Sequence, residues 1–493
     1  MVHAFDRSRL LRRAVLAGCV STVALAVSAA AVAAPAFQTG FYDYPTSAFD
    51  DSQAEAGFGR ARGAGTTVIK LNLYWATVAH ARRPANPVDP ADPTYDWSSF
   101  DRRVIAASRH GLQPLVTISS APPWASGNNG SDRPNVDELA LFARAAAQRY
   151  SGRFTPTGGD AYAEMLPRVR YWQVWNEPNL SMFLTPQRRN GVLVAAATYR
   201  NMVNRFTNAV KAVHPTNLVL AGGTGPFGVR DNTSPLTFMR EFLCLRPDLT
   251  AKRGCGPVRF DIWGHHPYTS GGPTHRALSR NDISLGDLPK MRKVLRAAVA
   301  KRKIVSRGRV RFWIDEFSWD TRPPDPGGVP LKLHARWTAE AMYRMWKNGV
   351  TLLVWFQLMD NRWTGACGNP YQSGLYFWSS NIATAKPKPA LRAFRFPFVA
   401  LRQSGRVLVW GRTPGSNAAR VTIQRKVGSR WRAVGSFRAG GNGVFQKRYG
   451  APWTSGFLRA KIGRTTSVPF SLARVPDRTL YPFGQRPRPG QCD

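Results

Sequence analysis

Two glutamates of this chain stand where short apolar segments end. Glu177 follows the segment 171–176 and precedes Pro178, which keeps the glutamate extended and stops a strand there. Glu316 follows a second apolar segment, 310–315. Two carboxyl groups that flank one bond can cleave a glycoside, because one protonates the leaving oxygen while the other attacks the carbon or activates water. The pair predicts this chemistry if the fold brings both side chains together.

The second segment offers two acids. Asp315 and Glu316 are neighbours, and neighbouring side chains of a strand point to opposite faces. Both faces of this strand are apolar, so the hydrophobic pattern leaves open which of the two acids takes part in the chemistry.

The elements that must position these acids alternate between strand and helix. Apolar segments predict eight strands, at 38–42, 67–73, 113–119, 171–176, 217–222, 260–264, 310–315 and 351–356. Helical patterns follow at 98–110, 136–150, 199–213, 288–300, 331–348 and 389–396. This alternation predicts an α/β fold, a (β/α)8 TIM barrel. Most long loops follow strands, so they enlarge a cleft at the carboxyl end of the barrel.

The pattern changes after the barrel. Short alternating strands separated by Gly-rich turns predict a small C-terminal all-β sandwich. We therefore expect four parts: a signal peptide at 1–34, the barrel at 35–398, the β-sandwich at 399–475 and a Pro-rich tail at 476–493.

The N-terminus predicts export. Four arginines between residues 7 and 13 precede an apolar run, 14–34, that closes in small residues, as in a Sec-type secretory signal. An uncleaved anchor is an alternative, since the run is nearly long enough to span a bilayer. The segment before Cys19 also resembles a bacterial lipoprotein box, but it lies close to the arginines. We expect a secreted protein without membrane insertion after cleavage.

The four cysteines beyond this segment predict disulfides in an oxidising compartment. A bond between Cys244 and Cys255 would close a short loop, and Cys367 with Cys492 would then tie the tail to the main body. Neither pair has the spacing of metal ligands, and His265-His266 diverge on a strand, so no metal is expected.

The chain carries 69 Lys and Arg against 29 Asp and Glu, a formal charge of +40. Such an excess can indicate an acidic partner, either an anionic glycan, a cell wall or nucleic acid. The arginines are scattered along the sequence rather than clustered in a block, which is typical of a cationic secreted protein. We therefore expect no nucleic-acid partner.

The motifs around both glutamates resemble those of clan A glycoside hydrolases, of the family 5 cellulase and family 39 β-xylosidase type. Asn176-Glu177-Pro178 is similar to the acid/base motif closing the fourth strand, and Glu316 to the nucleophile closing the seventh. His266-Pro267-Tyr268 resembles the His-x-Tyr motif after the sixth strand. The chain departs from the family on its second strand, where Lys70 or Asn72 stands in the region of an expected arginine, and after its third strand, where Ser119-Ser120 replaces a histidine.

The resemblance implies a role for each motif residue. Glu177 would be the general acid/base and Glu316 the nucleophile of a retaining enzyme that cleaves β-linked oligo- or polysaccharide. The implied substrate-binding residues are Asn176 at the sugar 2-hydroxyl, His266, Tyr268 beside Glu316, and Trp355 as the floor of a sugar subsite.

Other residues keep further interpretations open. Trp124 and Trp319 follow strands and are candidates for stacking on sugar rings. Lys70 and the surplus arginines suggest an anionic, uronic-acid substrate as one alternative. A non-catalytic glycan- or wall-binding protein on the same fold is another. We expect a carbohydrate partner, no cofactor and a monomer.

Overall fold

The computed structural model describes residues 36–42, 51–80, 82–128, 130–156, 164–365, 371–450, 453–475 and 477. The predicted signal peptide at 1–34 and the Cys367–Cys492 pair lie outside this part of the chain. No helix in it is long and apolar enough to cross a bilayer.

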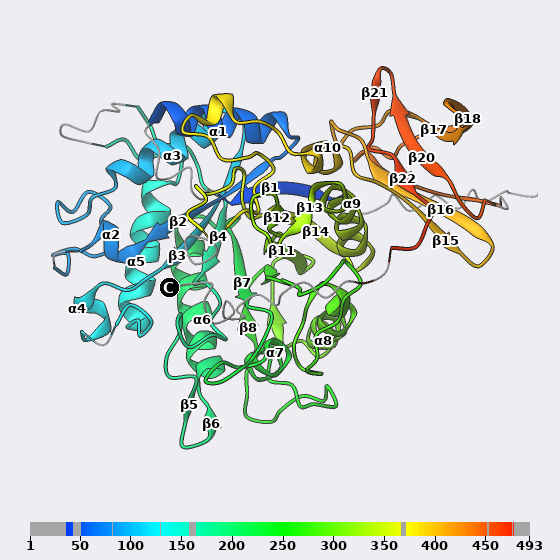
Figure 1. The fold of residues 1–493 in the computed structure, drawn as a ribbon. Helices are drawn as coiled ribbons and strands as arrows, with labels where there is room; N and C mark the ends of the chain where they lie inside the picture. Colours follow the sequence, from blue (N-terminus) through cyan, green and yellow to red (C-terminus); the bar gives the residue numbers. More distant parts are fainter. Residues whose placement is uncertain are drawn as a thin grey trace, which may run out of the picture. The chain divides into compact units, whose positions relative to one another are not determined.

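Eight parallel strands close into a barrel, which confirms the predicted TIM barrel (Figure 1). In barrel order they are β1 (Gln38–Tyr42), β2 (Val68–Tyr74), β3 (Gln113–Ser119), β4 (Tyr171–Val174), β7 (Leu218–Thr224), β9 (Ile262–His265), β11 (Arg311–Phe317) and β14 (Val350–Trp355). All eight overlap the segments predicted from sequence.

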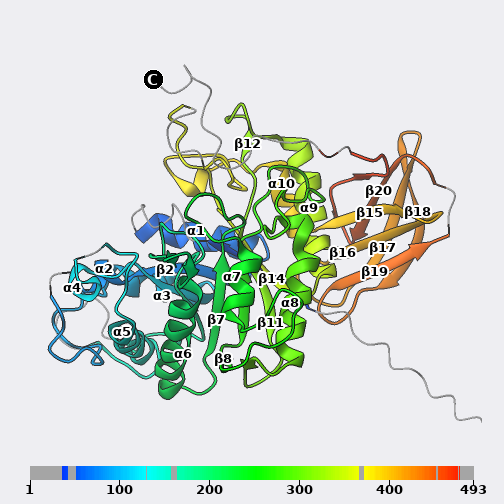
Figure 2. The same cartoon turned by 90° about the horizontal axis from the view of Figure 1, so that it is seen from below.

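Helices cover the outside of the barrel (Figure 2). The six predicted ones are α3 (Ser98–Arg109), α5 (Val136–Arg149), α6 (Ala195–Val213), α8 (Leu288–Ala300), α9 (Leu331–Lys347) and α10 (Pro389–Arg395). Two more helices were not predicted, α1 (Asp51–Gly63) and α7 (Pro235–Phe242). Short elements complete the loops: α2 (Trp75–Val78), α4 (Pro123–Ser126), η2 (Leu285–Asp287), η3 (Ile382–Thr384), β5 (Arg188–Arg189), β6 (Val192–Leu193), β8 (Val258–Arg259), β10 (Ile304–Val305), β12 (Thr321–Arg322) and β13 (Val329–Pro330).

Alternate residues of the strands build two apolar layers. The barrel interior holds Tyr42, Val68, Leu115, Tyr171, Leu220, Ile262, Trp313, Leu352, Val354 and Phe356. The residues between them face the helices and join the larger core. An apolar interior leaves the carboxyl-end mouth as the place for polar side chains.

Two antiparallel sheets follow the barrel and form the predicted sandwich. One contains β15 (Phe398–Gln403), β16 (Arg406–Arg412) and β19 (Val444–Tyr449). The other contains β17 (Arg420–Val427), β18 (Arg430–Arg438), β20 (Phe457–Ile462), β21 (Thr465–Thr466) and β22 (Phe470–Ser471). Phe437 and Phe445 join their inner faces, with ring centroids 5.7 Å apart.

The described residues of the sheets and of the barrel belong to the same compact unit. Trp410 is fully buried and contacts Tyr343 and Trp346 of α9, with ring centroids 5.6 and 5.7 Å away. The buried Arg412 donates to the carbonyl of Phe37, at 3.1 Å, just before β1. The barrel wall and the sandwich therefore share buried contacts.

Candidate active site

The backbone after β4 aims Glu177 at the barrel mouth. Trp175 and Glu177 both have positive φ, 64° and 38°, which is uncommon for residues with a Cβ. The extended conformation predicted for Glu177 from the following proline is therefore wrong. The N–H of Glu177 donates to the carbonyl of Gly223, 3.0 Å away, and this bond holds the turn against β7. Such strained conformations persist where the surroundings fix them, and they gather at functional sites.

A bulge in β11 resolves the competition between Asp315 and Glu316. Ile314 pairs with Leu353 and Phe317 with Trp355, so three steps on β11 match two on β14. The extra residue re-aims the side chains between these pairs. Asp315 points into the barrel and is fully buried, whereas Glu316 keeps 15% of its side chain exposed. Glu316 is thus the acid that reaches solvent.

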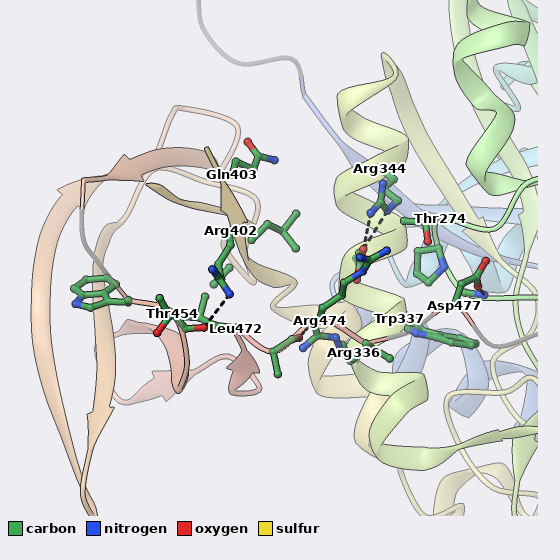
Figure 3. A pocket seen from close by; sticks show the side chains of 18 of the residues that line it. Thr274, Arg336, Trp337, Arg344, Arg402, Gln403, Thr454, Leu472, Arg474 and Asp477 are labelled. Atoms are coloured by element: carbon green, nitrogen blue, oxygen red, sulfur yellow. Dashed lines mark hydrogen bonds and ion pairs between the residues drawn. The ribbon is translucent and has the colours of Figure 1, made fainter. Parts of the chain in front are cut away.

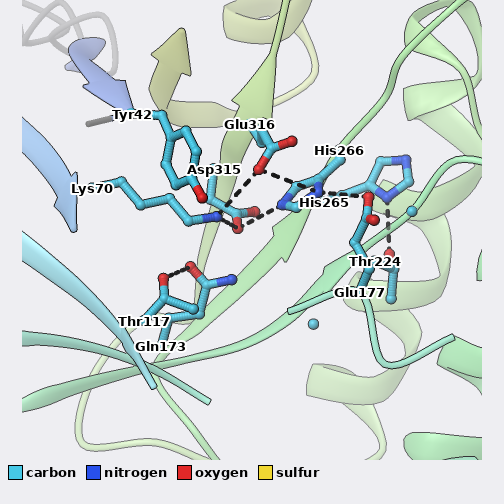
Figure 4. A network of polar contacts seen from close by, with 12 residues as sticks. Tyr42, Lys70, Thr117, Gln173, Glu177, Thr224, His265, His266, Asp315 and Glu316 are labelled. Atoms are coloured by element: carbon cyan, nitrogen blue, oxygen red, sulfur yellow. Dashed lines mark hydrogen bonds and ion pairs between the residues drawn. The ribbon is translucent and has the colours of Figure 1, made fainter. Parts of the chain in front are cut away.

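His266, directly after β9, connects the acids (Figure 4). Its Nδ1 lies 2.9 Å from Oε1 of Glu177 and 4.0 Å from Oε2 of Glu316, and its Nε2 lies 2.9 Å from Oδ2 of Asp315. Lys70 of β2 adds a second cation, with Nζ 3.3 Å from Asp315 and 3.7 Å from Glu316. Residues from four barrel strands or their ends, β2, β4, β9 and β11, thereby meet in one network.

Burial and charge set the protonation states in this network. Burial alone would lower the pKa of His266, but Asp315 and Glu316 raise it to about 10, so the imidazolium form dominates at neutral pH. Burial would raise the pKa of Asp315, but His266 and Lys70 hold it well below its usual range. Burial raises the pKa of Glu177, although the hydrogen bond with His266 opposes this. Burial therefore favours the protonated form of Glu177.

Glycines make room for the network. Gly222 and Gly223 both have positive φ, at a bulge where β7 pairs with β9. A Cβ on Gly223 would lie 2.5 Å from Nε2 of Gln173 and 3.0 Å from Oδ2 of Asp315. The Gly-rich sequence here is thus a strand-end bulge beside the buried acid.

Both glutamates open into one cleft of about 400 Å³. Tyr268 also lines it and donates a hydrogen bond of 2.8 Å to Oε1 of Glu316. Asn176 lies in the same wall, as the resemblance implied. The remaining lining side chains are Tyr42, Asn72, Tyr74, Ser119, Ser120, Ser131, Asp132, Trp175, Leu180, Met182, Phe183, Pro226, Phe227, Phe356 and Tyr371.

Two predicted substrate contacts are wrong because the side chains are buried behind the cleft. His266 and Lys70 have no exposed surface and do not line it. Their polar atoms contact carboxylates instead, so they position the acids rather than bind a ligand. His265, the neighbour of His266, contacts the hydroxyl of Thr224 and the carbonyl of Ile283. Among the described residues, no group of three His, Cys, Asp or Glu is arranged around a metal position.

The three predicted tryptophans also lie outside the cleft. Trp355 is fully buried and donates to the carbonyl of Ser373, because it faces the helices while its neighbours on β14 face inward. Trp319 is buried and donates to Gly271. Trp124 packs edge-on against Trp75. The prediction that Trp355 forms the floor of the sugar subsite is therefore wrong.

Phe356, one residue further on, takes the place that the sequence interpretation gave to Trp355. It lines the cleft and contacts Tyr42 and Tyr371, with ring centroids 5.1 Å away in each case. The period of two in β14 was the available signal, since Leu352 and Val354 already face the barrel interior. Tyr371, on the long loop after β14, carried no comparable signal.

The disulfide between Cys244 and Cys255 is present, which confirms the pairing expected for the short loop. It closes the segment after α7 on the outside of the barrel, away from the residues that line the cleft.

No family model matches the chain, and neither does any curated protein. Among solved structures, it is similar to a family 39 glycoside hydrolase from Bacteroides cellulosilyticus (15% identity, 82% of this chain and 79% of that chain, TM-score 0.49). It is also similar to a family 39 enzyme from Xanthomonas axonopodis (14%, 84% and 91%, 0.48) and to a monomeric β-xylosidase from Caulobacter crescentus (16%, 85% and 95%, 0.45). These likenesses are distant, so the function must be inferred from the chain's own cleft.

Proposed function

We propose that this protein is a secreted glycoside hydrolase that cleaves β-linked oligo- or polysaccharides with retention of configuration. Glu177 is the general acid/base and Glu316 is the nucleophile. The observation that carries this proposal is the convergence of the two carboxyl groups on one cleft and on one nitrogen, Nδ1 of His266.

The spacing supports retention. Oε1 of Glu177 and Oε2 of Glu316 lie 2.9 and 4.0 Å from the same nitrogen, so their separation cannot exceed the sum of those distances. Retaining glycosidases hold their carboxyl groups about 5–5.5 Å apart, and inverting enzymes about 6.5–9.5 Å apart. The limit accommodates the first range, which supports the proposal of a retaining pair.

The environment divides the roles between the two acids. Burial raises the pKa of Glu177, which favours the protonated form that a general acid needs. Glu316 accepts a hydrogen bond from Tyr268 and lies 3.7 Å from Nζ of Lys70, and these contacts hold its carboxyl group in place beside the cleft. We expect turnover to fall as pH rises through the pKa of Glu177, because the leaving oxygen then loses its proton donor.

The lining of the cleft favours neutral sugars. Its described charged residues are Glu177, Glu316 and Asp132, all acidic. The internal segments outside the described residues (43–50, 81, 129, 157–163, 366–370 and 451–452) contain no Lys or Arg in their sequence either. A uronate carboxylate entering here would meet like charges without a cation to pair with. We therefore favour neutral glycosides over the uronic-acid alternative.

Catalysis is also favoured over simple binding, because both acids reach the cleft while a buried network holds them. The disulfide, together with the signal peptide predicted at 1–34, supports the proposal of secretion into an oxidising compartment.

A panel of chromogenic aryl β-glycosides tests the proposal on the wild type, Glu177→Ala and Glu316→Ala. Loss of the nucleophile should lower kcat by about 10⁴-fold or more. Loss of the acid should cost about 10²–10⁴-fold. Azide should rescue both variants with opposite products, of inverted configuration for Glu316→Ala and of retained configuration for Glu177→Ala.

Glu164→Ala, at an exposed position away from the cleft, is the matched control and should keep full activity. Wild-type turnover in either active-site variant would overturn the assignment. If aryl glucuronides are cleaved faster than every neutral glycoside, the proposed preference for neutral substrates is wrong, while the roles proposed for the two glutamates are unaffected.

A further inference from the structure

The C-terminal sheets carry charge of a single sign. Residues 398–475 contain fifteen Lys and Arg and no Asp or Glu. They are Arg402, Arg406, Arg412, Arg420, Arg425, Lys426, Arg430, Arg432, Arg438, Lys447, Arg448, Arg459, Lys461, Arg464 and Arg474. Among the residues that the structure describes, none of these side chains pairs with a carboxylate. So much unpaired charge repels itself and attracts anions.

The strand register places some of these cations directly against one another. Arg420 lies opposite Arg438, and Arg425 lies opposite Arg432, in the ladder between β17 and β18. Like charges in directly opposed positions destabilise a sheet, and one acidic residue in either pair would relieve the repulsion. Stability of the sheet therefore does not account for these arginines.

A groove of about 890 Å³ runs between α9 and the first of the C-terminal strands (Figure 3). Arg402, Arg406 and Arg474 line it and are exposed to solvent. Arg402 donates to the carbonyl of Thr454, at 3.2 Å, which orients its guanidinium along the groove wall.

Both acids of the groove already have partners. Glu340 accepts a 2.7 Å bond from Arg344 of the same helix. Asp477 contacts His275 at 2.8 Å and accepts from the N–H of Gly272. The exposed arginines therefore remain the groups that a ligand would meet.

Trp453 connects the groove with the arginine pairs. It lines the groove, and the guanidinium of Arg425 lies 5.5 Å from its ring centroid. Trp453 is partly exposed, whereas the other ring of the lining, Trp337, is buried. A single ring beside arginines suits a sugar that bears acidic groups, while single-stranded nucleic-acid sites present successive rings to stacked bases.

We propose that this groove, with the neighbouring Arg425–Arg432 pair, binds an acidic polysaccharide through its carboxylate or phosphate groups. The site is separate from the cleft and goes beyond the proposed hydrolase function. It would hold the protein on an acidic polymer while the cleft acts on neutral glycosidic bonds.

Binding of the full-length protein to polygalacturonate, phosphomannan and neutral dextran tests the proposal. The protein should bind at least one acidic polymer, with an affinity that falls as NaCl rises, and should not bind dextran. The two acidic polymers distinguish carboxylate from phosphate as the recognised group. The double variant Arg406→Ser/Arg474→Ser should bind on the order of tenfold more weakly.

The control Lys293→Ser/Arg296→Ser removes two exposed cations from α8 and should bind like the wild type. Hydrolysis of a soluble aryl glycoside should be unchanged in both double variants, so a failed hydrolase assignment would not be confused with failed polymer binding. If both double variants lose polymer affinity equally, binding depends on net charge rather than on this groove, and the proposed site is wrong. Tighter retention of double-stranded DNA than of either acidic polymer would overturn the polysaccharide assignment.

Discussion

Positive side chains are buried and paired with carboxylates behind the cleft, whereas in the C-terminal sheets they are exposed and lie opposite one another. Behind the cleft, Lys70 and His266 are fully buried, and their nitrogens lie within 4.0 Å of two and three carboxyl groups, respectively. In the sheets, Arg420 and Arg438 are exposed and face each other. The contrast follows from solvation: a buried charge without a partner costs several kcal/mol, whereas water screens an exposed one.

This contrast separates two uses of charge. The buried pairs fix the positions of the acids that we propose act at one bond. The exposed arginines keep their charge available to an external partner. Net charge alone therefore says little about which sugar enters the cleft.

The largest effect on stability is expected at the centre of the buried network. Asp315→Ala leaves Lys70 and His266 without their shared carboxylate and should lower the free energy of unfolding by about 3–5 kcal/mol, measured by denaturant titration. Asp248→Asn, at an exposed position, should change it by about 0.5 kcal/mol or less. If the free energy of unfolding changes by a similar small amount in both variants, the pairing of buried charges does not contribute to stability as this comparison of the cleft and the sheets requires.

The pH dependence of stability sharpens the comparison further. The pKa of His266 is raised from 6.5 to about 10, so folding is favoured by proton binding. This contribution is fully present below pH 6.5 and is lost as pH rises through about 10. Thermal melts of the wild type should show a decline over that window, and His266→Gln should show a smaller one. An identical decline in His266→Gln would assign the pH dependence to other groups.

The aromatic wall of the cleft is expected to act on substrate affinity. Phe356→Ala removes a ring that lines the cleft, and we expect KM for an aryl glycoside to rise on the order of tenfold. Ser120→Ala removes only a hydroxyl from the same wall and serves as a milder control. Unchanged KM in Phe356→Ala would show that the sugar lies elsewhere in the cleft.

The smallest effect is expected in the sheets. Arg438→Glu places an acid opposite Arg420 and should raise the free energy of unfolding by about 0.2–1 kcal/mol. A loss of stability would contradict the view that these opposed arginines repel each other. Arg430→Glu, on the same strand but opposite Val427, is the control without a cationic partner.

Local patterns predicted most of the fold. The alternation of apolar strands and amphipathic helices identified all eight barrel strands and six helices, because burial of one face imposes a period on the sequence. Helix α1 was missed because Gly57, Gly59 and Gly63 weaken its helical pattern. Helix α7 was missed although Ser234 and Pro235 mark its start and Leu236, Met239 and Phe242 share a face.

The site was predicted in part. Glu177, Glu316, Asn176 and Tyr268 were identified through motifs and line one cleft. Trp355 was misplaced by one residue, and a shift of one residue on a strand moves a side chain to the other face. The roles of the two glutamates stay predictions until the variants are measured.

The sequence by itself determined the order of the elements, the two strand ends that carry the acids and the acid-free composition of the C-terminal sheets. The hydrophobic pattern left Asp315 and Glu316 open, and the structure supports the motif by bringing Glu316 to the cleft. The tertiary structure alone decided that Lys70 and His266 lie behind the cleft and which arginines of β17 and β18 face each other. These outcomes depend on bulges, strand register and burial, which are set by the pairing of one strand with another and leave no period in either strand by itself.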